Sequence, residues 1–193
     1  MNAETATLIA AIIAALSSIV TLVINLIAGR SSEFRVAYRE SLNPFLTELS
    51  DEIYSTIART KIMTQTKSEV SLENWRIRAK ESKTRLKEIR LKLRYQLWGI
   101  TDSMRTLALL PDWIEHARPL PNQQYSNELL RRGHSLGIAL DKAILNAYNN
   151  GRHPNWIERS RVNKADQNLR DVYKRMQNDQ ELRELMKDIR DDD

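Results

Sequence analysis

Residues 6–28 read ATLIAAIIAALSSIVTLVINLIA, a run that contains no charged residue and no proline. An α-helix rises about 1.5 Å per residue, so a helix of this length spans the roughly 30 Å hydrocarbon core of a bilayer. A cleaved signal peptide is the alternative, but its apolar stretch is shorter and follows a basic segment. The leader Met1–Glu4 holds no Lys or Arg. We therefore expect a retained transmembrane helix.

The charges that flank this run predict its orientation. Arg30, Arg35 and Arg39 follow it directly, and only the N-terminal amine before it is basic. Because positive residues stay on the cytoplasmic side, we expect the N-terminus outside and the rest of the chain inside. The expected protein is a single-pass protein of the inner (cytoplasmic) membrane, with residues 1–29 as the span and 30–193 as one cytosolic domain. The absence of cysteine agrees with a reducing compartment.

One face of the predicted span is made of small or polar residues, spaced alternately by four and three positions. Small residues let transmembrane helices approach closely, and Ser, Thr and Asn can hydrogen-bond across the contact. The pattern predicts a homo-oligomer with a left-handed seam. A polar pore lined by Thr21 and Asn25 and a lone anchor are the alternatives. The seam consists of Thr7, Ala11, Ala14, Ser18, Thr21, Asn25 and Ala28.

The cytosolic part is basic and is expected to be entirely helical. It carries all 30 Lys and Arg residues and every acidic residue except Glu4. Gly and Pro are sparse, at five each, and strand-like alternating runs are missing. The expected fold class is all-α, one N-terminal transmembrane helix followed by a helical cytosolic bundle. We expect helices at about 44–64, 72–98, 102–110, 126–149, 157–177 and 179–190, the first beginning at the proline after Asn43.

The long helix expected at 72–98 carries a row of six cations beside its apolar seam. Only Arg76 has an acidic partner nearby on this helix, Glu73. Like charges four residues apart on a helix repel mildly, so the row suggests a counter-anion elsewhere. We call this row the basic stripe, and it consists of Arg76, Lys80, Lys83, Lys87, Arg90 and Arg94.

Four counter-anions remain open for the basic stripe. The simplest is internal: the acidic C-terminal residues from Asp179 to Asp193, or plain solvation of a charged face. The others are the anionic inner leaflet, the phosphates of a nucleic acid and a small phosphorylated ligand. If the span assembles several chains, the stripes converge on a shared axis and present a ring of cations.

Signatures of catalysis are missing from the sequence. His116, His134 and His153 lack metal-ligand spacing, and the five glycines form no phosphate-binding loop. We expect no enzymatic activity, metal or cofactor. Gly133 and Gly137, four apart on a predicted helix, are typical of close helix packing.

The most site-like short segment is NNGRHPNW, residues 149–156. Its Arg152, His153 and Trp156 offer a fork-shaped cation, an imidazole and an aromatic face, which together suit a phosphate and a base. The alternative is a turn that ends one helix, with Trp156 anchoring the next.

In layout the chain resembles small single-pass membrane effectors of bacterial antiphage systems, nearest the membrane effectors of type III CRISPR systems, which bind cyclic oligoadenylate. The resemblance is one of architecture: one span, a basic helical cytosolic domain and expected symmetry. It implies a nucleotide-binding effector that senses an anionic ligand, such as a cyclic oligonucleotide, and perturbs the membrane in antiphage defence. The alternative function is a membrane-anchored scaffold that recruits an acidic protein partner. Binding of nucleic acid ranks below both.

Overall fold

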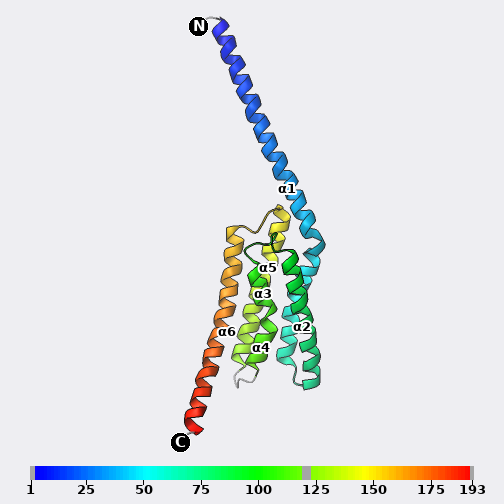
Figure 1. The fold of residues 1–193 in the computed structure, drawn as a ribbon, viewed down its shortest axis with the longest axis vertical. Helices are drawn as coiled ribbons and strands as arrows, with labels where there is room; N and C mark the ends of the chain where they lie inside the picture. Colours follow the sequence, from blue (N-terminus) through cyan, green and yellow to red (C-terminus); the bar gives the residue numbers. More distant parts are fainter. Residues whose placement is uncertain (1–2, 119–122, 192–193) are drawn as a thin grey trace.

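The computed structural model describes residues 3–118 and 123–191. Every regular element in these ranges is a helix (Figure 1), which confirms the all-α fold class. The loop predicted at Pro119 and Pro121 lies outside the described residues. The helices are α1 (Ala3–Gln65), α2 (Glu69–Lys92), α3 (Thr101–Ala108), α4 (Leu110–Ala117), α5 (Gln124–Asn150) and α6 (Trp156–Asp191).

Helix α1 runs without a break through Pro44, so the predicted helix start at this proline is wrong. Proline lacks the N–H that would bond the carbonyl of Glu40. Glu40 and Pro44 are both exposed, so this carbonyl lies on the solvent side of the helix, where water replaces the lost donor. On the opposite side, Leu42 and Leu49 are fully buried and hold the helix against the bundle before and after the proline.

The C-terminal half of α1 forms a bundle with the other helices. Helix α5 packs against α1 and α6, and α2 packs against α1 and α3. In Figure 1 the N-terminal part of α1 extends away from one end of the bundle, and the C-terminal part of α6 extends beyond the other. We call the first end the proximal end. It consists of residues 34–38 of α1, the turns at 93–100, and residues 151–160, which connect α5 to α6 and begin α6.

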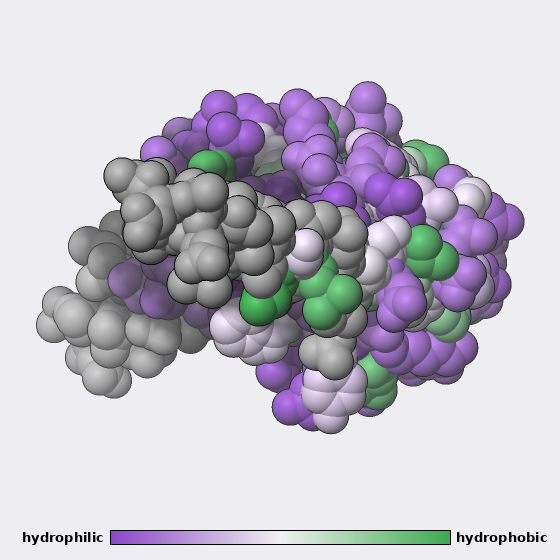
Figure 2. All heavy atoms as spheres, turned by 90° about the horizontal axis from the view of Figure 1, so that it is seen from above, coloured by the Kyte–Doolittle hydropathy of each residue, from purple (hydrophilic) through white to green (hydrophobic). Residues whose placement is uncertain are grey.

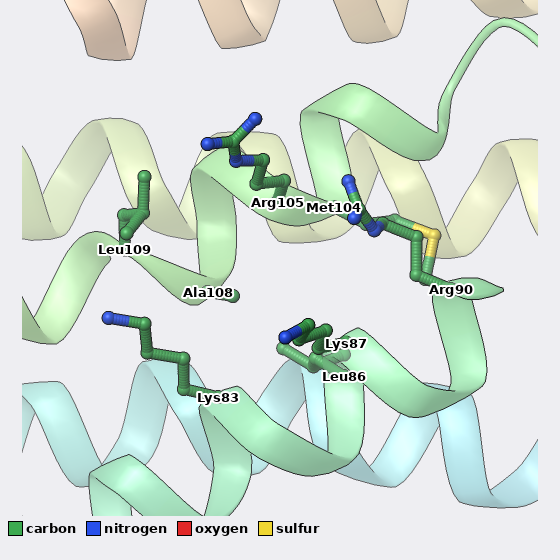
Figure 3. Close-up of a pocket in the computed structure, with 8 residues that line it drawn as sticks. All are labelled: Lys83, Leu86, Lys87, Arg90, Met104, Arg105, Ala108 and Leu109. Atoms are coloured by element: carbon green, nitrogen blue, oxygen red, sulfur yellow. The ribbon is translucent and has the colours of Figure 1, made fainter.

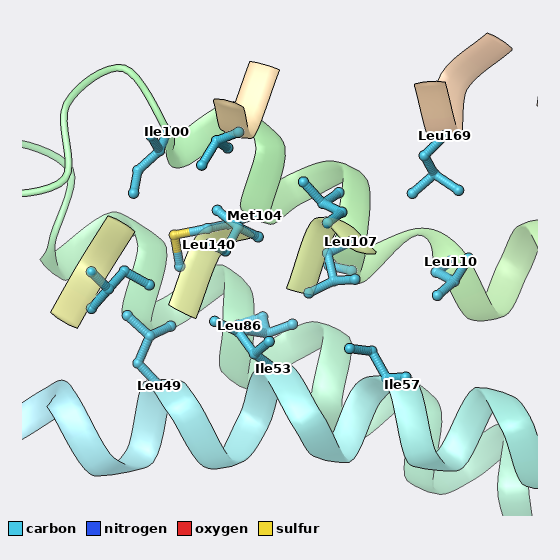
Figure 4. Packing of buried hydrophobic residues seen from close by; sticks show 14 of the residues in the cluster. Leu49, Ile53, Ile57, Leu86, Ile100, Met104, Leu107, Leu110, Leu140 and Leu169 are labelled. Carbon is cyan, nitrogen blue, oxygen red and sulfur yellow. The ribbon is translucent and has the colours of Figure 1, made fainter. Parts of the chain in front are cut away.

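The apolar seams expected from the sequence form the core (Figure 4). Ile53 of α1, Leu86 of α2 and Leu107 of α3 are each almost fully buried and belong to one cluster, which Leu140 of α5 and Leu169 of α6 complete. Full burial of an aliphatic side chain of this size stabilises the fold by about 1.5–3 kcal/mol. Residues along every helix of the bundle therefore contribute to one continuous core.

Two glycines set the closeness of α5 to its neighbours, as their spacing predicted. A β-carbon on Gly133 would overlap the side chain of Leu110, and one on Gly137 would overlap that of Ile57. Both glycines are buried. Their role is helix packing.

Several helix ends differ from the sequence-based boundaries. Helix α2 begins after the N-cap Ser68, whose hydroxyl accepts from the amide of Ser71, and ends at Lys92 rather than near Trp98. Residues 93–100 form consecutive turns. Helix α6 is continuous, so the predicted break between residues 177 and 179 is wrong.

Across the side chains that the structure describes, none of the helices combines the length and the hydropathy that crossing a membrane requires. Residues 6–28 lie within α1. Most of their side chains lie outside the described ones, and so do most members of the predicted association seam. Ser18, the member that is described, is exposed. The seam residues outside the described side chains are Thr7, Ala11, Ala14, Thr21, Asn25 and Ala28.

Candidate functional site

The basic stripe lies on one side of a helical hairpin. Helix α2 ends at Lys92, the chain reverses through the turns at 93–100, and α3 and α4 return along α2. Gly99 contributes a φ of 85°, a backbone conformation that side-chain-bearing residues rarely adopt. The reversal places acidic residues of α3 and α4 next to the cations of α2.

Every second member of the stripe forms an ion pair with this returning segment. The Nζ atom of Lys83 lies 2.5 Å from a carboxylate oxygen of Asp112, and a guanidinium nitrogen of Arg90 lies 4.0 Å from Asp102. Arg76 contacts Glu69, Glu73 and, most closely, Glu115. Hydrogen bonds to the carboxylates of Glu115 and then Glu73 raise the pKa of Arg76 above its ordinary value.

The other three members of the stripe have no carboxylate partner among the described side chains. Lys80, Lys87 and Arg94 are exposed. Among the side chains that the structure describes, no carboxylate lies within 4.0 Å of their charged groups. The acidic C-terminal residues were the expected internal partners of the stripe. Of these, Asp179 accepts a hydrogen bond from Tyr125 instead, and the side chains from Glu181 onward lie outside the described ones. The stripe thus alternates between paired and unpaired cations.

A cavity of about 430 Å³ lies between α2 and α3 along this stripe (Figure 3). Lys83, Lys87 and Arg90 line it from α2, and Arg105 lines it from α3. In Figure 3 the ammonium groups of Lys83 and Lys87 lie in the space between the two helices, whereas the guanidinium of Arg105 points away from α2. The apolar part of the lining consists of Leu86, Met104, Ala108 and Leu109.

The charge of this cavity is positive after its ion pairs are considered. Lys83 is paired with Asp112 and Arg90 with Asp102, while neither Lys87 nor Arg105 has a carboxylate within 4.0 Å among the described side chains. Cations around an apolar floor accept a ligand that carries both phosphates and a planar or apolar part. The volume is within the range of small-ligand sites.

A smaller hollow of about 190 Å³ continues the basic surface toward the turns. Arg90 and Arg94 line it, together with Leu91, Thr101 and Asp102. Lys80 and Arg76, which lie nearer the start of α2, line neither of these two cavities. Four of the six stripe residues therefore surround two adjoining spaces.

Segment 149–156 has a structural role that the sequence left open. Gly151, at φ 59°, ends α5, with the amide of Arg152 bonded to the carbonyl of Ala147. Asn155 and Glu158 cap α6 reciprocally: the Asn155 side chain accepts from the Glu158 amide, and the Glu158 carboxylate accepts from the Asn155 amide. This arrangement is a helix-ending turn followed by a capping box.

The three residues singled out in that segment have separate positions. Arg152 lies 3.5 Å from Glu158, and a ring nitrogen of His153 lies 3.0 Å from the carbonyl oxygen of Gln96. Trp156 is 73% exposed. None of the three lines the cavity between α2 and α3, so the structure does not bring them together with the basic stripe.

Tyr38 is the most perturbed titratable group near this segment. Its ring packs edge-on against His153, and its hydroxyl donates to the carbonyl oxygen of Gln96 at 2.6 Å. Burial raises the pKa of Tyr38 to about 12; the cation of Arg152 lowers it and the carboxylate of Glu158 raises it to smaller extents. Tyr38 and His153 therefore join α1 and the α5–α6 connection to the turns at 93–100.

The α3 side of the cavity is the part that sequence reasoning missed. Met104 and Arg105 belong to the short helix α3, and Leu109 follows at its C-cap. None of them is assigned to a site from the sequence. The antiparallel order of the acidic residues was the available signal. Counted outward from the turns at 93–100, the cations on α2 are Arg90, Lys83 and Arg76. Their partners on the other side of the turns are, in the same order, Asp102, Asp112 and Glu115.

No protein-family model matches this chain, and no curated protein or solved structure matches it either. The functional proposal therefore depends on the chemistry of the site and on the sequence.

Proposed function

We propose that this protein is a membrane-anchored, homo-oligomeric effector that binds a phosphorylated ligand, of the cyclic oligonucleotide class, in the cavity between α2 and α3. The observation that carries the proposal is the lining of that cavity: four cations around an apolar floor, two of them without a carboxylate partner among the described side chains. The proposed setting is antiphage defence, in which ligand binding leads to perturbation of the membrane.

The two kinds of cation have different roles in this proposal. Lys83 is held by its close ion pair with Asp112, whereas Arg90 makes only a long contact with the exposed Asp102. Lys87 supplies the charge that a phosphate neutralises. Arg105, whose exposed guanidinium points away from α2, adds its charge when the side chain turns toward the cavity. Leu86 and Met104 offer apolar surface on which a base lies. The protein acts in this scheme as a sensor and not as an enzyme.

The membrane part of the proposal is supported by sequence. Residues 6–28 carry no charge, and Arg30, Arg35 and Arg39 follow them. The same helix, α1, continues from these residues into the bundle. We place the N-terminus outside the inner membrane and residues 30–193 in the cytoplasm, with the small-residue seam as the contact between spans.

Calorimetric titration of the full-length protein in detergent tests the ligand. At low salt, cyclic oligoadenylate should bind with micromolar affinity, and added salt should weaken binding because the contacts are ionic. Lys87→Gln should reduce the affinity. Lys142→Gln, which removes an exposed cation of α5, is the matched control and should leave it unchanged. Absence of binding at low salt would refute the nucleotide version of the proposal.

A scaffold that recruits an acidic protein is the second candidate. The exposed row of Lys80, Lys87 and Arg94, which has no carboxylate partner among the described side chains, favours it, because such a row suits an acidic helix as well as a phosphate. Replacing Ser18, Thr21 and Asn25 together by Leu distinguishes the two functions. An anchor tolerates this change, whereas an effector that acts through its span loses its effect on the membrane.

A further inference from the structure

The proximal end of the bundle gathers exposed aromatic side chains. Phe34, Tyr95, Trp98 and Trp156 are 53%, 78%, 64% and 73% exposed. Among the described residues, Tyr54 is the one other aromatic residue with an exposed side chain, and it lies farther along α1. Exposed tryptophans are costly in water and are typical of surfaces that meet a partner or a membrane.

The contacts among these residues show that they belong to one end of the molecule. The ring of Phe34 lies 6.2 Å from that of His153, which in turn contacts the carbonyl of Gln96. The guanidinium of Arg159 lies 4.7 Å from the centre of the Trp98 ring. The turns at 93–100 are thus joined to α1 on one side and to the start of α6 on the other.

Cations accompany the aromatic residues. A hollow of about 570 Å³ is lined by Arg159 and Lys164 together with Trp156, Gly99, Ser160 and Asn163. Figure 2 views the molecule from the side of the α1 N-terminus and shows a largely hydrophilic surface with scattered pale and hydrophobic residues. Aromatic rings mixed with Lys and Arg are the composition of protein surfaces at the boundary between lipid and water.

The position of α1 identifies the partner. Residue 28, the last of the apolar run, is six positions before Phe34 in the same helix, which corresponds to about 9 Å along the helix axis. A bilayer that holds residues 6–28 therefore lies directly against the proximal end. No other surface of the bundle is so constrained by the chain itself.

We infer that the proximal end rests on the membrane surface, with Trp98, Trp156 and Phe34 at the level of the lipid headgroups and with Arg159 and Lys164 binding the phosphate of an anionic lipid. This inference rests on the membrane anchoring proposed above. It assigns Trp156 to lipid contact, and it leaves the cavity between α2 and α3 free to take a ligand from the cytoplasm.

Quenching of tryptophan fluorescence by brominated lipids tests the inference. The full-length protein is reconstituted into vesicles of phosphatidylcholine and phosphatidylglycerol whose acyl chains are brominated near the headgroup. We expect part of the emission to be quenched, and this part to be lost in the double variant Trp98→Phe, Trp156→Phe. Trp75→Phe is the matched control, because Trp75 is half-buried and packs against the smaller core cluster that contains Met63 and Leu72, away from the proximal end. This variant should keep the quenched part.

The outcomes separate the inference from the proposed function. In the first outcome, alkaline buffer does not remove the protein from the vesicles, but brominated lipid quenches the emission of wild type and of the double variant equally. The anchoring then stands, and the proximal end does not rest on the membrane. If the protein does not remain with the vesicles, the anchoring itself is refuted, and the inference with it. Quenching that disappears in vesicles of zwitterionic phosphatidylcholine alone supports the role of the anionic lipid, and quenching unchanged there overturns that role.

Discussion

The guanidinium of Arg76 donates two hydrogen bonds to a single carboxylate oxygen of Glu115, from Nε at 3.0 Å and from Nη2 at 2.8 Å. This contact joins the beginning of α2 to α4, at the far end of the hairpin from the turns. It removes Arg76 from the set of cations available to a ligand, although this residue belongs to the same row as the others.

The first prediction concerns Arg76 itself. Arg76→Gln breaks the contact between α2 and α4, so the thermal unfolding midpoint should fall while ligand affinity stays the same. Lys80→Gln, one turn along the same helix, is the control and should leave the midpoint unchanged, since Lys80 is exposed. Thermal unfolding followed by circular dichroism measures the first effect and calorimetry the second. A lower affinity in the Arg76 variant would show that the stripe acts as a whole.

The second prediction concerns Arg105, for which we expect the converse of Arg76: a lower ligand affinity and an unchanged thermal midpoint. Arg105→Gln should weaken binding of the anionic ligand by about tenfold, because a hydrogen bond to a charged group contributes about 1.5–3 kcal/mol. The thermal midpoint should remain that of wild type, since no carboxylate among the described side chains pairs with Arg105. Arg161→Gln, an exposed cation of α6 outside the cavity, is the matched control for net charge. Equal losses in both variants would mean that only net charge matters.

The third prediction is a loss of stability at alkaline pH that depends on Tyr38. Burial raises the pKa of Tyr38 in the folded protein to about 12, from about 10. Between these values the unfolded chain releases the phenol proton while the folded protein keeps it. The stability is therefore complete below about pH 10 and falls as pH rises toward 12, by up to about 1.4 kcal/mol per pH unit.

The variant Tyr38→Phe isolates this effect. It loses the hydrogen bond to Gln96 and should be less stable than wild type at about pH 9. By about pH 11 the gap should shrink or reverse, because phenylalanine does not titrate. Thermal midpoints at the two pH values measure the change. A gap that is independent of pH would contradict the raised pKa.

The fourth prediction concerns the close approach of α1 to Gly151. A β-carbon there would lie 2.8 Å from the backbone of Arg35, and the φ of 59° is unfavourable for any residue with a side chain. Gly151→Ala should lower the free energy of unfolding by about 2–3 kcal/mol through both effects. Gly29→Ala is the control, since nothing lies within 4 Å of its added carbon. Equal stability of the two variants would contradict the packing of α1 on this turn.

The sequence predicted the helical class and the buried faces because periodicity reports burial directly. Leu49, Ile53 and Ile57 recur at helical spacing within the helix predicted at 44–64, and all three are buried. The same logic misplaced the end of α2. Leu93, Leu97 and Ile100 continue the spacing of a helix and are buried, but they lie in turns. A pattern of buried positions does not distinguish a last helical turn from a compact reversal that buries the same residues.

The wrong helix start at Pro44 has a different cause. A proline inside a helix costs less where the carbonyl that loses its donor faces water, and the exposure of a helix face depends on the tertiary fold. Which cations of the basic stripe form ion pairs also depends on the tertiary fold. The stripe was visible in the sequence, but its division into paired and unpaired cations follows from Asp102, Asp112 and Glu115, which the hairpin places beside it.

The continuity of α1 makes it a lever. Its 63 residues correspond to about 95 Å of helix, of which about 60 Å lies on the N-terminal side of Pro44. The helix changes direction where it joins the bundle (Figure 1), and its C-terminal part packs against α2, which forms one wall of the cavity. A tilt of about 5° imposed there displaces the opposite tip by about 5 Å, since helix geometry fixes the length of the arm. In the proposed function, a small rearrangement around the ligand is transmitted along this one helix to residues 6–28.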